Sequence, residues 1–411
     1  MKQAIWFYVL AMGSALVSCT NTPKNDTTMR ATTTEYAKGS LGYDKAFLKK
    51  YDSSLVELKL GAATVLVSAK YQAKVFTSGA KGANGPSFGW INYKAFDAPI
   101  DAHMNAYGGE NRFWLGPEGG NYSVFFQPGT EMVFDNWKTP AAIDTESWTI
   151  SHQSDSTVLL QKQMTITNYQ GTELNMQVER SISIASKEVA EASLGVKLGD
   201  SIVLVGYHTS NQLTNTGSFP WTVKTGMPCI WILDMFTPSD ATTIVIPFKP
   251  GKATDKIATT DYFGQIPPDR IKLTDKTLFF KADGKSRGKL GILPKHVLPL
   301  AGSYDATNKL LTITQFSVDN KARYLNQEWT TTKPTFSGDA MNAYNDGPLA
   351  NGSQMGPFYE LESVSPAAAL ATGEKMRHQH NVYHFTGSVE QLNTIAQQLL
   401  GVGLEEIKKA F

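Results

Sequence analysis

The feature that most limits the fold of this chain is the alternation of apolar and polar residues in short runs between turn-forming residues. Residues 158–184 alternate in this way on both sides of residues 168–171, a four-residue turn that ends in glycine. A period of two is typical of a half-buried strand, and a short loop between two such strands predicts a β-hairpin. Two earlier runs, residues 55–60 and 64–75, predict a second hairpin.

Further short runs of the same kind follow along the chain, each bounded by Gly, Pro, Asp or Asn. They lie at residues 201–205, 242–247, 277–280, 309–316 and 382–385. Many short strands without helices between them favour a large antiparallel sandwich over alternating strands and helices. The 34 glycines, 19 prolines and 11% aromatic residues are also typical of a turn-rich β protein. We therefore predict an all-β fold, a large antiparallel β-sandwich.

One helix is predicted, at the C-terminal end. Ser388 followed three residues later by Gln391 is a capping-box pattern, apolar residues recur on one stripe as far as Leu399, and Gly401 is a stop signal. On length alone, a chain of 411 residues would be expected to hold about two or three domains. No repeat or linker divides it, so residues 41–411 are expected to form a single domain.

The N-terminal segment predicts export. Residues 1–18 begin with Lys2, continue through an apolar run at 4–17 and end in a small residue. This pattern is typical of a secretory signal peptide, and the apolar run is too short to span a bilayer comfortably.

The end of that segment predicts a lipid anchor. Leu16-Val17-Ser18-Cys19 resembles a bacterial lipobox, in which the cysteine becomes the lipid-modified first residue, and residues 19–40 form a polar tether. The alternative is a plain secretory peptide with an accidental cysteine. We expect a lipoprotein of the cell envelope that is anchored to the outer membrane through lipid on Cys19.

The charge balance and the second cysteine exclude two further roles. Lys and Arg number 38 and Asp and Glu number 37, so the net charge is +1 and no nucleic-acid partner is expected. Cys229 stands in an apolar run beside Ile230 and Trp231. We expect its thiol to be buried and without a catalytic role.

The densest polar and aromatic segment is residues 103–120. Its glycines at 108–109 permit a tight turn close to a ligand, Glu110 and Arg112 are a candidate ion pair, and Trp114 offers a flat apolar surface suited to a sugar ring. The alternative is a glycine-rich turn with a purely structural ion pair.

A second segment, residues 207–221, places His208 at the end of an apolar strand and follows it with Asn211 and Asn215. A lone histidine is more often structural than catalytic, but the amide groups that gather here favour a role in a site.

A third segment, near the C-terminal end, gathers acidic, aromatic and histidine residues: Glu328, Trp329, Tyr344, Asp346, Glu360, Glu362, His378 and His380. Residues two apart on a strand share a face, so Glu360 and Glu362 should point the same way, as should His378 and His380. Such groups are suited to acid and base catalysis, or to holding a divalent metal. The alternative is a solvent-facing strand edge.

These three segments, in this order, resemble the galactose mutarotase-like superfamily, which includes the aldose 1-epimerases. The resemblance rests on Gly-Gly followed by Arg-Phe-Trp-Leu within 108–115, the Thr-Asn-x-x-Gly-Thr hairpin at 167–172, His208 with Asn211, and Leu-Glu-Ser at 361–363. It implies a β-supersandwich fold and a carbohydrate partner.

Two longer stretches, residues 108–120 and 356–363, more closely resemble a branch of bacterial envelope lipoproteins. That closer resemblance implies no particular chemistry.

In the aldose 1-epimerases, a glutamate removes the proton of the anomeric hydroxyl and a histidine protonates the ring oxygen. The resemblance implies Glu362 for the first role and His208 for the second. Two departures bear on this assignment. Where the epimerases carry a histidine just before Gly-Gly, this chain has Tyr107, and the nearest histidine is His103; the glutamate is also duplicated by Glu360.

Three functions fit these segments. The first is a sugar epimerase or mutarotase. The second is a glycan-binding lipoprotein, in which aromatic residues such as Trp114 and Trp329 stack on sugar rings without turnover. The third is a glycoside hydrolase or lyase, with Glu118 or Glu328 opposite Glu362.

The candidate catalytic residues are His208, Glu362, Glu360 and His103. The candidate substrate-binding residues are Glu110, Arg112, Trp114, Asn211, Glu328, Trp329, Tyr344 and Asp346. No cofactor is expected, the alternative being a divalent metal held by Glu360, Glu362, His378 and His380.

Overall fold

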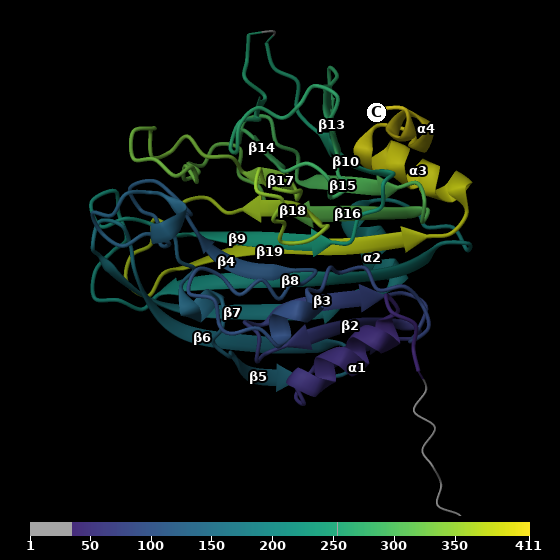
Figure 1. The fold of residues 1–411 in the computed structure, drawn as a ribbon, viewed down its shortest axis with the longest axis horizontal. Helices are drawn as coiled ribbons and strands as arrows, with labels where there is room; N and C mark the ends of the chain where they lie inside the picture. Colours follow the sequence, from purple (N-terminus) through teal and green to yellow (C-terminus); the bar gives the residue numbers. More distant parts are fainter. Residues whose placement is uncertain (1–34, 253) are drawn as a thin grey trace, which may run out of the picture. The chain divides into compact units, whose positions relative to one another are not determined.

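The computed structural model describes residues 35–252 and 254–411, and antiparallel strands dominate it (Figure 1). The signal peptide, Cys19 and the tether as far as residue 34 lie outside the described residues, so the predictions about them stay predictions. From Tyr36 onward the chain forms one compact unit. None of the helices in the described part of the chain is both long and apolar enough to cross a membrane.

The largest sheet has ten strands and contains the hairpin predicted from residues 158–184. In this hairpin β6 (Thr157–Thr167) pairs with β7 (Glu173–Ile184), with Met164 opposite Met176. The other strands are β5 (Thr149–Gln153), β8 (Val203–Asn215), β10 (Thr242–Pro247), β12 (Ile271–Leu273), β13 (Thr277–Lys281), β15 (Leu300–Asp305), β16 (Leu310–Phe316) and β19 (Lys375–Thr386). Their order across the sheet is β12-β13-β10-β15-β16-β19-β8-β7-β6-β5.

A six-stranded sheet packs against this one and positions the candidate site. Its strands, in order, are β11 (Ala258–Thr259), β14 (Gly288–Ile292), β17 (Met341–Asn345), β18 (Tyr359–Val364), β9 (Cys229–Phe236) and β4 (Arg112–Gly116). Cys229 is fully buried, as predicted, and burial raises the pKa of its thiol to about 12. The second predicted hairpin becomes part of a separate three-stranded sheet, β1 (Val56–Leu60), β2 (Ala63–Ser68) and β3 (Lys74–Gly79).

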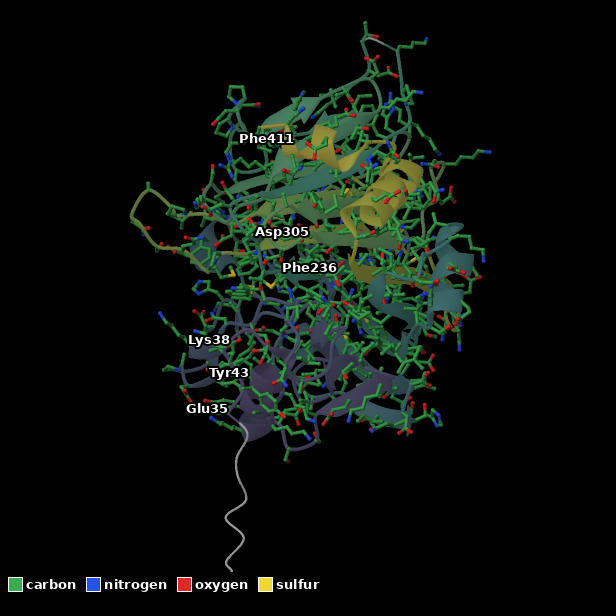
Figure 2. All side chains as sticks on the ribbon, turned by 90° about the vertical axis from the view of Figure 1, so that its right-hand side faces the viewer. Glu35, Lys38, Tyr43, Phe236, Asp305 and Phe411 are labelled. Atoms are coloured by element: carbon green, nitrogen blue, oxygen red, sulfur yellow. The ribbon has the colours of Figure 1, made fainter. Side chains whose placement is uncertain are left out.

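The two larger sheets face one another across a continuous apolar core, and side chains fill the space between them (Figure 2). On β18, Leu361 is fully buried in this core, and the Tyr359 hydroxyl lies 2.7 Å from that of Ser303 on the opposite sheet. Successive side chains of a strand point to opposite faces, so Glu360 and Glu362 share the face that points away from the core. The i, i+2 spacing predicts this shared face.

Helices cover the outer face of the ten-stranded sheet. The predicted C-terminal helix is α3 (Val389–Leu400), and the Ser388 hydroxyl caps it by accepting a hydrogen bond of 3.3 Å from the backbone N–H of Gln391. It is followed by α4 (Leu404–Lys408). Elsewhere in the described part of the chain, the loops before β5 contain the short 3-10 helices η1 (Tyr93–Phe96), η2 (Phe134–Asn136) and η3 (Ala141–Ile143). The prediction of a large antiparallel β-sandwich with a C-terminal helix is confirmed.

Before the C-terminal end, two α-helices were not predicted: α1 (Leu41–Tyr51) precedes the first strand, and α2 (Lys187–Leu194), between β7 and β8, contradicts the expectation that no helix lies among the strands. The helix α1 has a mixed sequence, and it is held by tertiary packing such as the edge-on contact of Phe47 with Tyr93, at 4.8 Å between ring centres. The helix α2 has eight residues, too few for a clear periodic pattern, although Ser186 caps it.

Candidate functional site

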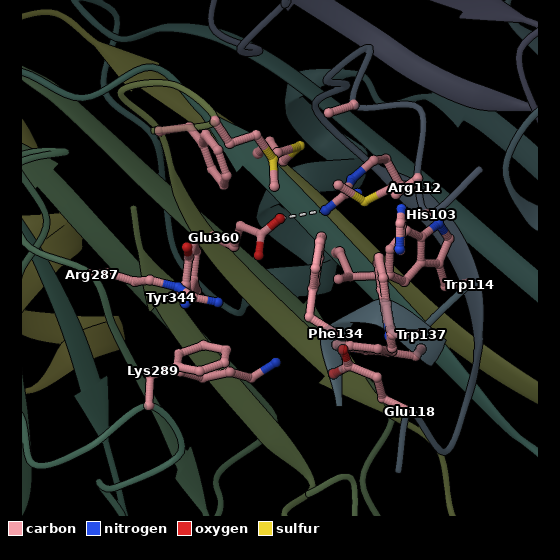
Figure 3. Close-up of a pocket in the computed structure, with 18 of the residues that line it drawn as sticks. His103, Arg112, Trp114, Glu118, Phe134, Trp137, Arg287, Lys289, Tyr344 and Glu360 are labelled. Atoms are coloured by element: carbon pink, nitrogen blue, oxygen red, sulfur yellow. Dashed lines mark hydrogen bonds and ion pairs between the residues drawn. The ribbon is translucent and has the colours of Figure 1, made fainter. Parts of the chain in front are cut away.

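A cavity of about 350 Å³ opens on the face of the six-stranded sheet that points away from the core (Figure 3). This volume lies within the range of sites that bind small molecules. Eight of its lining residues are aromatic: Trp114, Phe134, Trp137, Trp231, Phe263, Trp329, Tyr344 and Phe358. Its charged lining residues are Asp101, Arg112, Glu118, Arg287, Lys289 and Glu360.

The register of the six-stranded sheet explains why the floor residues meet. Lys289 of β14 pairs with Tyr344 of β17, and Tyr344 pairs in turn with Glu360 of β18. Glu360 pairs with Met235 of β9, and the edge strand β4 adds Arg112. Directly opposed residues of paired strands point to the same face, so a single row across neighbouring strands forms the floor.

Aromatic side chains from the loops form the walls. The ring of Trp137 is stacked with those of Phe125 and Trp329, whose centres are 5.7 and 6.0 Å away. Nearby, the ring of Phe134 is stacked on that of His103, with centres 4.7 Å apart and planes 7° from parallel. These stacks present flat apolar surfaces to the cavity.

Two ion pairs lie at the floor. The Arg112 guanidinium donates a hydrogen bond to the Glu360 carboxylate, which Figure 3 marks with a dashed line. Just behind them, Glu362 Oε2 accepts hydrogen bonds from Lys289 Nζ at 3.0 Å and from the Trp231 indole N–H at 2.8 Å. Glu362 Oε1 and Arg112 Nε are buried and find no hydrogen-bond partner in the described part of the chain. The protein alone therefore leaves hydrogen-bonding capacity at the floor unused.

Burial changes the proton affinity of the floor residues. It raises the pKa of Glu360; Arg112 opposes this rise and Glu362 adds to it. Burial also raises the pKa of Glu118, against the charge of Lys289. Burial by itself would lower the pKa of Lys289, but the three carboxylates around it raise that pKa above its ordinary value. The floor thus holds a protonated lysine beside carboxyl groups that take up protons more readily than usual.

Six residues singled out from the sequence line the cavity: His103, Arg112, Trp114, Trp329, Tyr344 and Glu360. Two others lie behind it. Glu362 holds Lys289, and Asp346 accepts a hydrogen bond of 2.7 Å from the Tyr344 hydroxyl. The structure brings these residues together, while the role of each in a reaction stays a prediction.

The structure does not bring His208 to the cavity. Tyr207 and Thr209 occupy the core-facing positions of β8, so the alternation of the strand directs His208 to the outer face of the ten-stranded sheet. There its Nε2 lies 2.7 Å from the Tyr383 hydroxyl. The pairing of His208 with Glu362 that the resemblance implies is therefore corrected, because the two lie on opposite outer faces of the sandwich.

Three further candidates lie elsewhere. Glu110 pairs with His384 in the core, at 3.0 Å, so the expected ion pair of Glu110 with Arg112 does not form. Asn211 is fully buried between the sheets. Glu328 is absent from the cavity lining and pairs with a lysine of its own loop at 2.6 Å.

The alternative of a metal site is also corrected. The two histidines, which belong to β19, contact the core face of β18, whereas the two glutamates lie on the other face of β18. His378 Nε2 and His380 Nδ1 lie 2.8 and 2.7 Å from the Ser363 hydroxyl, on the core side. Glu360 and Glu362 point the other way. Within residues 35–252 and 254–411, no three His, Cys, Asp or Glu side chains are grouped so that they could hold a metal ion.

Several cavity residues were not singled out from the sequence: Phe134, Trp137, Trp231, Phe263, Arg287, Lys289 and Phe358. Glu118 was expected to act only in the alternative of a glycoside hydrolase or lyase. A usable signal existed for Lys289, because it stands within a short apolar run and a lysine in a buried strand is rare unless it is paired. The loop residues Phe134 and Arg287 carry no comparable local signal.

Fold and cavity together define an antiparallel β-sandwich protein with an aromatic-lined, small-molecule-sized site on one outer sheet face. The chain belongs to a family described as a family of unknown function (DUF6786), whose model matches residues 39–411. No curated protein sequence matches this chain.

Among solved structures, the chain is similar to a galactose mutarotase-like protein from Lactobacillus casei, with a TM-score of 0.46, 10% identity, and coverage of 80% of this chain and 100% of the other. It is also similar to a galactose mutarotase related enzyme from Lactobacillus acidophilus, with a TM-score of 0.46, 6% identity, and coverage of 81% and 98%. Both names fall in the superfamily that the sequence motifs resemble, and at these scores the similarity carries no argument about activity.

Proposed function

We propose that the cavity binds a saccharide and that the protein catalyses proton transfer at its anomeric centre, most simply 1-epimerisation. The observation that carries this proposal is the position of Glu360, whose carboxyl faces an aromatic-lined cavity and is held there by Arg112. Aromatic walls suit the apolar faces of sugar rings, and a positioned carboxyl with a raised pKa can exchange protons near neutral pH.

Epimerisation needs one group that removes the proton of the anomeric hydroxyl and another that protonates the ring oxygen. We assign the first role to Glu360 and the second to His103, since both line the cavity. Stacking on Phe134 fixes the plane of the His103 ring. Glu362, the base that the resemblance implies, becomes a positioning residue because Lys289 occupies its carboxylate.

The test is to incubate the protein with the pure α-anomers of glucose, galactose and mannose and to follow equilibration by polarimetry or NMR. At least one should equilibrate faster than in buffer. Glu360→Gln should lower this rate by about 100-fold or more, because an amide cannot accept the proton. Glu328→Gln, which changes a carboxylate outside the cavity, is the matched control. The epimerase proposal fails if no anomer equilibrates faster than in buffer.

Glycan binding without turnover is the second candidate, and the stacked rings of Trp137 and Trp329 favour it, since they offer a longer apolar wall than proton transfer requires. Isothermal calorimetry separates the two candidates. Binding that persists in Glu360→Gln, together with no turnover by the native protein, would select the binding function.

We further propose that Cys19 carries lipid and anchors the protein to the outer membrane of the cell envelope. The support comes from the sequence, in which residues 1–18 and the lipobox-like residues 16–19 precede a polar tether. Cells grown with labelled palmitate should label the native chain but not Cys19→Ala, and the label should follow the outer-membrane fraction. Cys229→Ser is the matched control, and label on the Cys19 variant would contradict the proposal.

A further inference from the structure

Three cationic side chains line the cavity, and two of them are paired with carboxylates. Arg112 pairs with Glu360, and Lys289 pairs with Glu362. Arg287 has no carboxylate oxygen within 4.0 Å anywhere in residues 35–252 and 254–411. It is also exposed, so its charge is accessible from the open side of the cavity.

The fold holds Arg287 in place. Its guanidinium carbon lies 3.8 Å from the centre of the Phe263 ring. The loop that carries it is fixed by Asn345, whose side chain donates to the Ser286 carbonyl and accepts from the Gly284 N–H, each at 2.9 Å. Figure 3 shows the Arg287 side chain extending into the cavity. A guanidinium ordered in this way loses little conformational entropy when it binds a ligand.

The remaining carboxyl groups of the lining, Glu118 and Asp101, form no ion pair with Arg287. Glu118 lies across the cavity from Arg287 (Figure 3); burial raises the pKa of Glu118, and the charges of Lys289 and Arg287 oppose that rise. Asp101 lies beside His103, at 3.4 Å. A cation that the protein leaves uncompensated is complementary to a negative group on the ligand.

We propose that the saccharide carries an anionic substituent and that Arg287 binds this substituent, an inference that rests on the proposed function. The substituent is a carboxylate, a sulfate ester or a phosphate ester. A guanidinium forms two parallel hydrogen bonds with such oxyanions. Hydrogen bonds to charged groups are strong enough for an anionic sugar to bind about 10- to 100-fold more tightly than its neutral counterpart. Arg287 then determines specificity, while Glu360 remains the reacting group.

Calorimetric titration of the full chain at low salt tests this inference. The probes are glucose, galactose and mannose, their uronic acids, and their 6-sulfates and 6-phosphates. At least one anionic probe should bind about 10-fold or more tightly than the parent hexose, and added salt should reduce the difference. The probe that gains most identifies the source of the anionic group.

Two variants of the same loop complete the experiment. Arg287→Gln should remove the preference for the anionic probe, so that the anionic sugar and the parent hexose bind equally tightly. Lys285→Gln, which removes a positive charge outside the cavity where it pairs with Asp240 at 2.7 Å, should change neither affinity. Equal binding of neutral and anionic sugars, or a preference that survives in Arg287→Gln, overturns the inference but leaves the proposed function. Binding of no probe at all overturns both.

Discussion

The core side of the sandwich and the cavity side of the six-stranded sheet both carry charged groups, but the charges in the core are buried in pairs, whereas the cavity also presents an exposed charge. In the core, each of two carboxylates has an imidazole partner: Asp234 lies 2.6 Å from His380, and Glu110 lies 3.0 Å from His384. On the cavity side, Arg287 has no carboxylate partner in the part of the chain that the structure describes.

This difference separates stability from binding. Breaking a buried pair leaves a charge or a hydrogen-bonding group stranded in the core, so a complete pair is a condition of folding. A charge that the protein leaves unpaired at a cavity is instead available to a ligand. Substitutions in the core should therefore act on the free energy of unfolding, and substitutions at the cavity should act on saccharide binding.

The largest effect is expected for Asp234→Ala. It removes the partner of His380 and also an acceptor for the Asn111 amide, which donates at 2.6 Å. The free energy of unfolding should fall by about 3–5 kcal/mol, measured by chemical denaturation. Asp200→Ala, at an exposed position, should leave the denaturation midpoint unchanged. A similarly small effect of both variants would remove the distinction between the two regions.

Acid should also destabilise the core side. Burial, with a smaller contribution from His380, lowers the pKa of His378 from 6.5 to about 3. Between these two pKa values His378 is protonated in the unfolded chain but not in the folded chain, so the free energy of unfolding falls as the pH drops from about 6.5 toward 3. From pH 7 to pH 4 this loss amounts to about 3 kcal/mol. Denaturation of His378→Gln across this range should show a flatter dependence, and an unchanged slope would exclude His378 as its cause.

Glu362→Gln tests the boundary between the two regions. The variant leaves Lys289 without its charged partner, while an amide oxygen can still accept the hydrogen bond from Trp231. We expect a loss of about 1–3 kcal/mol in stability together with weaker saccharide binding. Thermal unfolding and calorimetry measure the two effects, and Glu328→Gln is the control. Loss of stability without any change in binding would assign Glu362 to the folding core alone.

The smallest effect on stability is expected for Phe134→Ala. This side chain is 59% exposed, so its removal should change the free energy of unfolding by less than about 0.5 kcal/mol. Because its ring lines the cavity, saccharide affinity should nevertheless fall by up to about 10-fold, the value of one aromatic stack. Val223→Ala, at a position 55% exposed and outside the cavity, should leave affinity unchanged.

Local patterns predict the parts of the fold that local interactions determine. The hairpin of residues 158–184 and the helix α3 were predictable because alternation, turn residues and the Ser388 cap all act within a few positions. The helix α1 was not, because its stability comes from packing against residues about fifty positions away, such as Tyr93.

The site shows the same limit. The alternation of side chains along a strand predicts that Glu360 and Glu362 share a face, and in the structure they do. The same alternation predicts that Tyr207 and His208 point to opposite faces of their strand. It does not predict which face of which sheet carries the cavity, because the position of the cavity depends on how the whole sandwich packs. Arg287 lies in a loop, where position follows from tertiary contacts that no local pattern records.

The alternation within β18 ties the alignment of the cavity floor to hydrogen bonds made in the core. Glu362 and Ser363 are neighbours on one strand, and two imidazoles hold Ser363 from the core side. A slip of the strand by one residue would turn the carboxylates inward, so these buried bonds act as a lock on the alignment of the cavity floor.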